Sequence, residues 1–188
     1  MTVQQRNRVI ILLAAAAILL TAIVYAYIIP AQDARTEAYN KAQKDPLTHD
    51  LGSILPYKSD YMGDAPNISQ LLYRLPLADV PVSLELDSEH LWVQVHYEAS
   101  SSDYKEEKLH QALVYNAAAI FSLIRNVNGV EFSFSDVTYR VARMDLMRNW
   151  DISSEELLDP ETWKNQLQDR LKRPGFLQNC MDCFEIKE

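Results

Sequence analysis

The chain begins with a long apolar run that is followed by shorter alternating patterns. Residues 9–29 contain no charged side chain, and Arg6 and Arg8 directly precede them. A helix rises about 1.5 Å per residue, so this run is long enough to cross a hydrocarbon layer of about 30 Å. We expect one transmembrane helix, closed by Pro30, within an N-terminal region of residues 1–30. A cleaved signal peptide is the alternative, although the run is long for one.

The charges around the apolar run favour an N-terminus inside the cell. Arg6 and Arg8 lie close to one end of the run, whereas acidic Asp33 and Glu37 follow the other end. We therefore expect a single-pass anchor in the cell membrane that contacts the bilayer through residues 9–29. The bulk of the chain is then extracytoplasmic.

Residues 31–56 predict a juxtamembrane helix and a linker. Residues 31–44 are rich in helix-forming side chains, and Pro46 and Gly52 then interrupt that pattern. The remaining residues 57–188 are enough for one compact domain with a single core.

Four segments of this domain alternate apolar and polar residues with a period of two, which is typical of strands with one buried face. These segments are residues 80–86, 91–97, 130–135 and 137–141. A short turn joins each pair, so we expect two β-hairpins. Between the hairpins, residues 104–125 carry an apolar stripe at helical spacing, and Asn128-Gly129 is expected to end that helix with glycine in the left-handed conformation.

Stacking the helix on the sheet buries both apolar faces. The pattern therefore predicts an α+β fold, a two-layer β-β-α-β-β domain with an antiparallel-rich four-stranded sheet. Flanking helices are also expected. Pro66 marks a helix start, Ser153 and Glu156 match a capping box, and Asp159-Pro160 opens a last helix that Pro174-Gly175 ends.

The charge balance narrows the choice of partners. Removing Arg6 and Arg8 from the 18 basic residues leaves 16 against 26 acidic residues, a formal charge of −10 for the rest of the chain. Nucleic acid is excluded as a partner because its binding requires a clustered basic surface. An anionic bilayer would also repel this domain, so we expect lipid contact to stop at the anchor.

Four stretches carry a family resemblance, namely Lys58–Asp64, Leu71–Leu72, Leu75–Leu77 and Leu113–Asn126. They resemble a family of domains of unknown function that are membrane-tethered and extracytoplasmic in Gram-positive bacteria. The resemblance covers residues 57–143. It implies an outward orientation and supports the domain boundary, and it supplies no catalytic residue.

Cys180 and Cys183 are the main candidates for chemistry. In an oxidising compartment we expect them to form a local disulfide that pins the C-terminal tail. A redox motif would need a thiolate stabilised at a helix N-terminus, and the residues after Cys183 indicate no helix. Free thiols are the expectation if the domain is cytoplasmic.

A zinc site would need two further ligands from four scattered histidines whose spacing matches no zinc finger. The histidines are His49, His90, His96 and His110. We therefore predict no metal and no cofactor.

The segment around Gly63 is the candidate binding loop. In one interpretation Gly63 takes a backbone conformation closed to other residues, and Asp64 caps the helix that begins near Pro66. In the other, Asp60, Tyr61, Gly63 and Asp64 form a recognition surface, because loops on rigid elements often bind ligands. The sequence does not separate the two.

The sequence carries no motif of a known reaction class. It lacks a Gly-x-Ser-x-Gly elbow and a His-Glu-x-x-His helix, and its four glycines form no phosphate loop. We therefore predict a non-catalytic binding or regulatory module whose partner is an envelope protein or peptide. One alternative is a thiol–disulfide oxidoreductase or redox sensor that uses Cys180 and Cys183. Another is a structural component of a membrane assembly.

Overall fold

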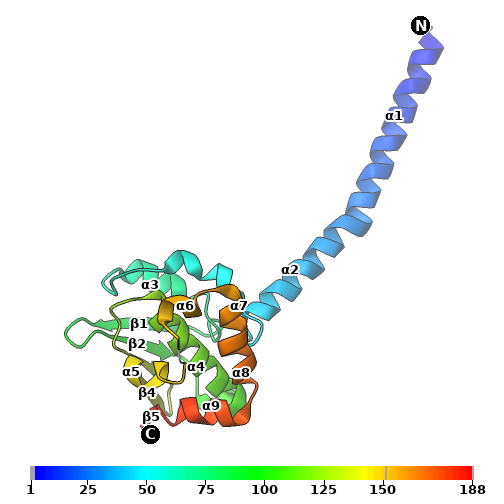
Figure 1. Ribbon diagram of the computed structural model, residues 1–188. Coiled ribbons are helices and arrows are strands. Elements are labelled where there is room, and N and C mark those ends of the chain that lie inside the picture. The colour runs from blue at the N-terminus through cyan, green and yellow to red at the C-terminus, as the bar shows by residue number, and fades with distance from the viewer. Residues whose placement is uncertain (1–2, 151, 188) are drawn as a thin grey trace. The chain divides into compact units, whose positions relative to one another are not determined.

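The chain forms two compact units, Met1–Lys41 and Ala42–Glu188 (Figure 1). The computed structural model describes residues 3–150 and 152–187. Met1 and Thr2 of the predicted N-terminal tail, and Asp151 and Glu188 of the predicted domain, therefore lie outside the described residues, as do the side chains of Val9 and Ile11 in the predicted span.

The described residues of the N-terminal unit are part of one continuous helix of 41 residues, Val3–Gln43. It consists of α1 (Val3–Ile23), a π-helical segment (Val24–Ile28) and α2 (Ile29–Gln43). This helix is long and apolar enough to cross a membrane, and none of the described residues in its most apolar stretch is buried. The prediction that Pro30 closes the helix is wrong. Proline lacks the amide hydrogen for the usual bond four residues back, and the wider π turns directly before Pro30 accommodate that loss.

The second unit begins earlier than the predicted boundary at residue 57, because the expected linker is packed into it. Two short 3-10 helices, Leu51–Ser53 and Leu55–Tyr57, occupy this segment. Leu51 and Ile54 are buried in the core. The long helix ends at Gln43, just before Pro46, as expected, whereas Gly52 lies within the first 3-10 helix. The apolar residues of this segment still bury their surface.

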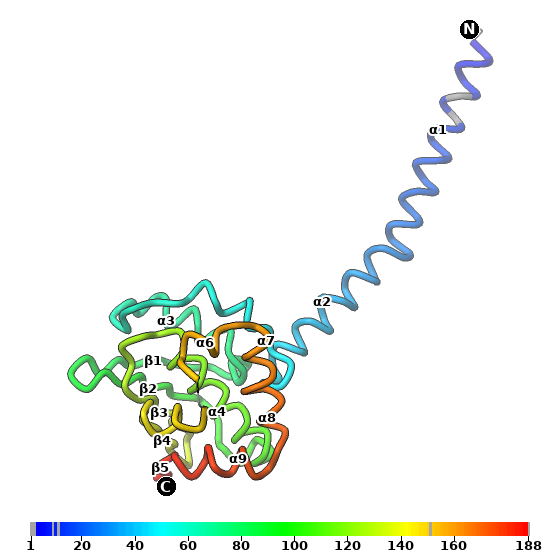
Figure 2. Tube along the Cα trace, viewed as in Figure 1, coloured from blue at the N-terminus to red at the C-terminus, as the bar shows by residue number. Residues whose placement is uncertain are grey.

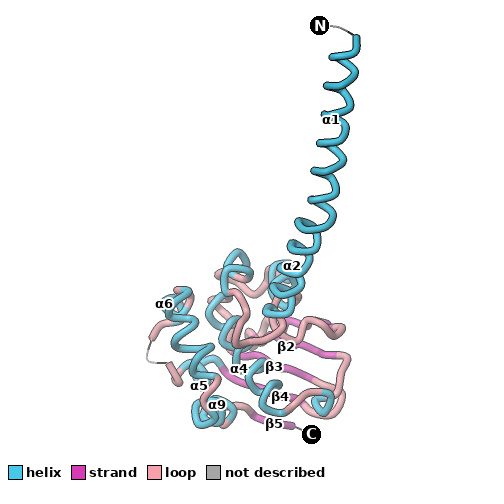
Figure 3. The backbone as a smooth tube through the Cα atoms, turned by 90° about the vertical axis from the view of Figure 1, so that its right-hand side faces the viewer, coloured by secondary structure: helices cyan, strands magenta, loops and turns pink. Residues whose placement is uncertain are grey.

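Five strands form one mixed sheet in the order β1-β2-β3-β4-β5 (Figures 2 and 3). The strands are β1 (Val82–Asp87), β2 (Trp92–Tyr97), β3 (Gly129–Ser133), β4 (Thr138–Ala142) and β5 (Glu185–Lys187). Both predicted hairpins are present as the antiparallel pairs β1–β2 and β3–β4. Strands β2 and β3 are parallel because the long helix crosses between them. The sheet has one strand more than predicted, since β5 pairs antiparallel with β4.

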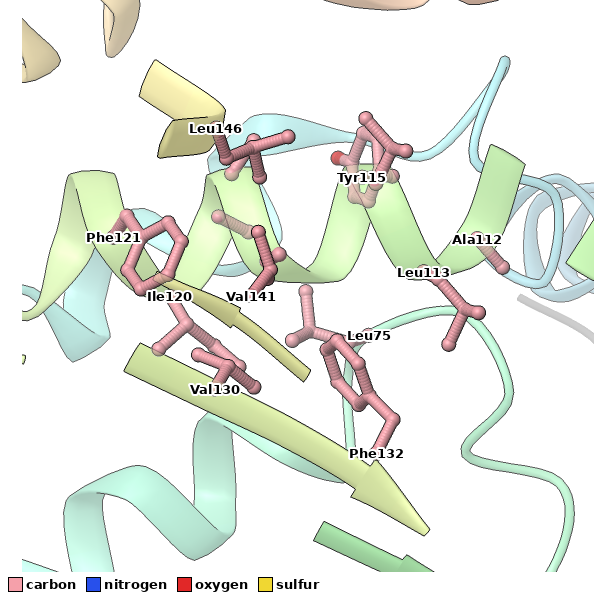
Figure 4. Packing of buried hydrophobic residues seen from close by; sticks show 14 of the residues in the cluster. Leu75, Ala112, Leu113, Tyr115, Ile120, Phe121, Val130, Phe132, Val141 and Leu146 are labelled. Atoms are coloured by element: carbon pink, nitrogen blue, oxygen red, sulfur yellow. The ribbon is translucent and has the colours of Figure 1, made fainter. Parts of the chain in front are cut away.

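Helix α4 (Glu106–Leu123) is the centre of the core. On its sheet side, Ile120 lies close to Val130 of β3 and Val141 of β4 (Figure 4). The helix is also covered by other helices, so that every residue from Gln111 to Leu123 is buried rather than a single stripe. The predicted two-layer packing therefore has an additional helical cover.

The other helices surround this core. They are α3 (Ala65–Leu72), a 3-10 helix (Ser101–Asp103), α5 (Arg143–Met147), α6 (Ser154–Leu157), the successive segments α7 (Pro160–Thr162), a π helix (Trp163–Gln168) and α8 (Asp169–Leu171), and α9 (Pro174–Met181). The capping box is confirmed, because Ser153 Oγ accepts from the Glu156 amide at 3.1 Å and the Glu156 carboxylate accepts from the Ser153 amide at 2.8 Å. Pro174-Gly175 starts α9 and does not merely end the preceding helix, since proline suits the first helical turn.

The end of α4 differs from the prediction for Asn128-Gly129. The helix ends at Leu123, and Gly129 lies in β3 without a positive φ. Glycine is required there for another reason, because a Cβ atom would lie 2.3 Å from Cε2 of Trp92. Arg143 supplies the cap instead, donating to the carbonyls of Phe121, Ile124 and Val127. Burial lowers the pKa of the Arg143 guanidinium to about 10.

Candidate functional site

The predicted binding loop is fastened to the end of α4. The Ser59 amide donates to the Leu123 carbonyl at 2.9 Å, and the Arg125 amide donates to the Ser59 carbonyl at the same distance. The amide of buried Met62 donates to Asn126 Oδ1 at 2.7 Å. These bonds hold the segment before α3 on a rigid support.

The four predicted site residues have different roles in this loop. Asp64 caps α3, because its carboxylate accepts from the Asn67 amide at 3.2 Å, as the structural interpretation required. Gly63 has no positive φ and a Cβ there would meet open space, so the expectation of a special glycine conformation is wrong. Tyr61 is 71% exposed, and Asp60 lies 3.8 Å from the Arg125 guanidinium. Ligand binding by these residues stays a prediction.

A polar cleft of about 380 Å³ lies beside the loop. Its lining consists of Lys58, Asp60, Phe121–Leu123, Arg125, Arg143 and Ser153–Glu155. The charges in it are paired internally: Lys58 lies 2.9 Å from Glu155, and its hydrogen bond lowers the pKa of that carboxyl group. The buried Ser122 hydroxyl has no hydrogen-bond partner among the described residues. No described base contacts this hydroxyl, so the cleft lacks the geometry of an activated nucleophile.

A larger groove of about 580 Å³ lies between α3 and β1. Its lining consists of Ala65, Ser69, Leu72, Tyr73 and residues 82–86. Strand β1 is at the edge of the sheet, so the groove runs beside a strand that has a neighbour on one side only. Tyr73 is 57% exposed at the end of α3. The sequence identified the apolar alternation of β1 but not its edge position, because strand order is a property of the tertiary structure.

The predicted disulfide between Cys180 and Cys183 is absent, and both cysteines are free. Cys180 is buried in α9, and burial raises the pKa of its thiol to about 12. The Cys183 thiol lies beyond the end of that helix and donates to the Asp145 carbonyl at 3.3 Å. The short spacing of the two residues was a misleading signal, because the helix end directs the thiols to different surroundings.

The four histidines lie apart, each with its own contacts. His90 lies 2.8 Å from Asp87 in the β1–β2 turn, and His96 lies 4.0 Å from Glu85 on the sheet surface. His110 lies in a small hollow of about 280 Å³ beside α9, where burial lowers its pKa. Within residues 3–150 and 152–187, no group of three or more His, Cys, Asp or Glu side chains is placed to hold a metal ion.

His49 belongs to a buried hydrogen-bond chain that the sequence did not reveal. Its Nε2 lies 2.7 Å from the Arg74 carbonyl, which can only accept, so Nε2 carries the hydrogen. Nδ1 then accepts from the Tyr115 hydroxyl at 2.8 Å, and that oxygen accepts from Trp163 Nε1 at 3.1 Å. Burial lowers the pKa of His49. This neutral chain joins the supposed linker to α4 and the C-terminal helices.

Comparison with known proteins gives one match. The family model described as "Domain of unknown function (DUF4825)" matches residues 54–144, which include α3, α4 and the first four strands. This supports the predicted resemblance to an uncharacterised domain, while membrane tethering and Gram-positive origin stay predictions. No curated protein and no solved structure matches the chain.

Proposed function

We propose that this protein is a non-catalytic binding or regulatory module that is anchored in the cell membrane and recognises a protein or peptide outside the cytoplasm. The anchor is supported by the helix Val3–Gln43, in whose most apolar stretch no described residue is buried. The acidic balance of the rest of the chain favours a soluble domain held away from anionic lipid.

The groove between α3 and β1 carries the binding part of the proposal. Its volume of about 580 Å³ is within the range of ligand sites, and one wall is an open strand edge. The polar cleft near Asp60 is a weaker candidate, because its charged side chains already have partners within the protein.

Photo-crosslinking in intact membranes tests this proposal. A photoreactive phenylalanine analogue in place of Tyr73 would lie at the groove, and the same analogue in place of Tyr61 would lie on the predicted loop. Met144 is the matched control, since it is 85% exposed on α5 and does not line the groove. We expect one defined product from the Tyr73 position, which excess purified partner from the same membranes competes away, and none from Met144.

Two results would contradict the proposal. One is equal labelling from Tyr73 and Met144. The other is turnover of a wall, peptide or thiol substrate by the purified protein that depends on one polar side chain. The orientation has its own test: protease added to intact cells should digest the domain, and protection until lysis would invert the topology.

A redox function is not favoured by the geometry. The Cys180 thiol is buried and its pKa of about 12 leaves almost no thiolate at neutral pH.

A further inference from the structure

The backbone of β1 is open along the side that faces away from β2. The Glu98 amide donates to the Pro81 carbonyl at 3.0 Å, which extends the antiparallel register of the β1–β2 pair by one residue. In such a ladder alternate residues bond to the neighbouring strand. The amides and carbonyls of Val82, Leu84 and Leu86 therefore point away from β2, toward the groove.

The groove has the form that an added strand requires. Val82, Leu84 and Leu86 are half-buried on β1, and Leu72 and Tyr73 belong to the opposite wall. An extended segment beside β1 would alternate its side chains across the sheet, one set toward α3 and the other toward solvent. Apolar residues suit the first set, because these walls are mainly apolar.

The negative charge of the protein determines which extended segments are favoured as partners of β1. Glu85 lies in the middle of β1 with its side chain 73% exposed, and the chain has a net charge of −8. Opposite charges on neighbouring strands attract across a pair, whereas like charges repel. A basic residue is therefore favoured opposite Glu85, and a second copy of this acidic protein is disfavoured.

The opposite edge of the sheet does not offer the same site. Strand β5 has three residues, two of which are the charged Glu185 and Lys187. Short charged strands are a common way to keep a sheet edge from pairing with other chains. Strand β5 lines none of the three hollows described above, at α3 and β1, beside Asp60 and at His110.

We propose that β1 accepts an extended peptide segment as a sixth strand, and that this segment alternates apolar residues with Lys or Arg. The segment belongs to a partner protein and lies between β1 and α3. This inference rests on the proposed function, since it names the chemistry of the partner for the same groove.

Synthetic peptides test the main-chain part of the inference. The probe is a fluorescent ten-residue peptide in which valine alternates with lysine, titrated against the full-length protein in detergent and followed by anisotropy. Methylating the backbone nitrogens of one alternate set removes the hydrogen bonds to β1, and methylating the other set changes groups that face solvent. We expect a loss of about tenfold or more in affinity for one set and less than about threefold for the other.

Variants of β1 provide a second test. Leu84→Pro removes an amide that faces the groove but no bond to β2, so it should abolish binding while the folded signal persists. Leu84→Ala keeps the amide and serves as its control. Glu85→Lys should reduce the preference for the valine–lysine peptide over a valine–glutamate peptide by about two- to fivefold. Glu185→Lys on β5 should leave that preference unchanged.

Equal effects of the two methylation patterns, or no binding of the valine–lysine peptide, would overturn the inference. Neither result decides the proposed function, because the Tyr73 crosslink reports any partner at the groove regardless of its backbone conformation. Failure of both the peptide and the crosslink would reject both proposals.

Discussion

The two longest apolar helices of this protein, α1 and α4, are covered in different ways. Ile18 of α1 is 71% exposed, whereas Leu113 and Ile120 of α4 are fully buried beneath the sheet and the other helices. Apolar surface is stabilised by removal from water in either case. Helix α4 is therefore covered by other parts of this chain, whereas the apolar stretch of α1 is uncovered among the described residues and is long enough to cross a bilayer.

The largest effect is expected from an aspartate placed in each helix. Ala118→Asp would bury an unpaired charge in α4, and we expect a loss of about 4–5 kcal/mol or more in the free energy of unfolding. Ala16→Asp in α1 should leave that free energy unchanged and instead oppose membrane insertion by about 2.5–3.5 kcal/mol. Denaturant titration and membrane flotation measure the two effects. A destabilised domain in Ala16→Asp would break the distinction between the helices.

Shortening the buried Phe121 side chain near the end of α4 tests the apolar packing of this helix by itself. Phe121→Ala removes a fully buried ring, so we expect a loss of about 3–5 kcal/mol in the free energy of unfolding. Tyr61→Ala is the exposed control and should change this quantity by less than about 0.5 kcal/mol. A loss below about 1 kcal/mol for Phe121→Ala in a denaturant titration would mean that α4 is not tightly packed.

The hydrogen bonds of Tyr115 on α4 should contribute less to the free energy of unfolding than the apolar packing of this helix. Tyr115→Phe keeps the ring but leaves His49 Nδ1 and Trp163 Nε1 without their partner. We expect a loss of about 1–3 kcal/mol, measured by denaturant unfolding at neutral pH. Tyr57→Phe is the control, because Tyr57 does not belong to the hydrogen-bond chain of His49, Tyr115 and Trp163. No change in Tyr115→Phe would show that the buried chain is not a stabilising contact.

The hydrogen-bond chain that contains His49 predicts a pH dependence of the domain's stability. Burial lowers the pKa of His49 below 6.5, outweighing the bond to Arg74 and the nearby Asp50. The unfolded state therefore binds a proton more readily, so stability is complete above pH 6.5 and falls as the pH drops through the folded value. Unfolding midpoints at pH 7.5 and 5 should show this fall, and His49→Gln should flatten it. An equally steep fall in His49→Gln would assign it to other groups.

The smallest effect concerns α3, a short helix that depends on its cap as well as on its buried face. Asp64→Ala removes the bond to the Asn67 amide, and we expect a loss of about 1 kcal/mol in the free energy of unfolding. Asp60→Ala in the same loop removes only a solvent-exposed ion pair and should change it by less than about 0.5 kcal/mol. Equal losses would place the effect in the loop rather than in the helix cap.

Local patterns were sufficient for much of the fold. The two hairpins, the helix between them and the caps at Asp64 and Ser153 were predictable, because side-chain periodicity and capping depend on residues close in sequence. Strand β5 was missed because its three exposed residues show no buried alternation. The role of Gly129 was missed for a different reason, since it depends on the Trp92 ring of the neighbouring strand.

The candidate site was less predictable than the fold. The loop from Asp60 to Asp64 was identified from its residue types, yet the structure uses Asp64 as a cap and pairs Asp60 with Arg125. The groove beside β1 had only a partial sequence signal, the apolar alternation of residues 80–86. The groove is a candidate binding site because β1 is an edge strand, and no local pattern in the sequence specifies that position.

By itself the sequence determined that a long apolar helix precedes an acidic α+β domain, because uncharged length and side-chain periodicity are local properties of the chain. Only the tertiary structure decided that Leu51 and Ile54 of the expected linker join the core, that both cysteines are free and that β1 lies at an open edge. These features arise from contacts between segments distant in sequence, where burial and backbone pairing depend on what each residue meets after folding.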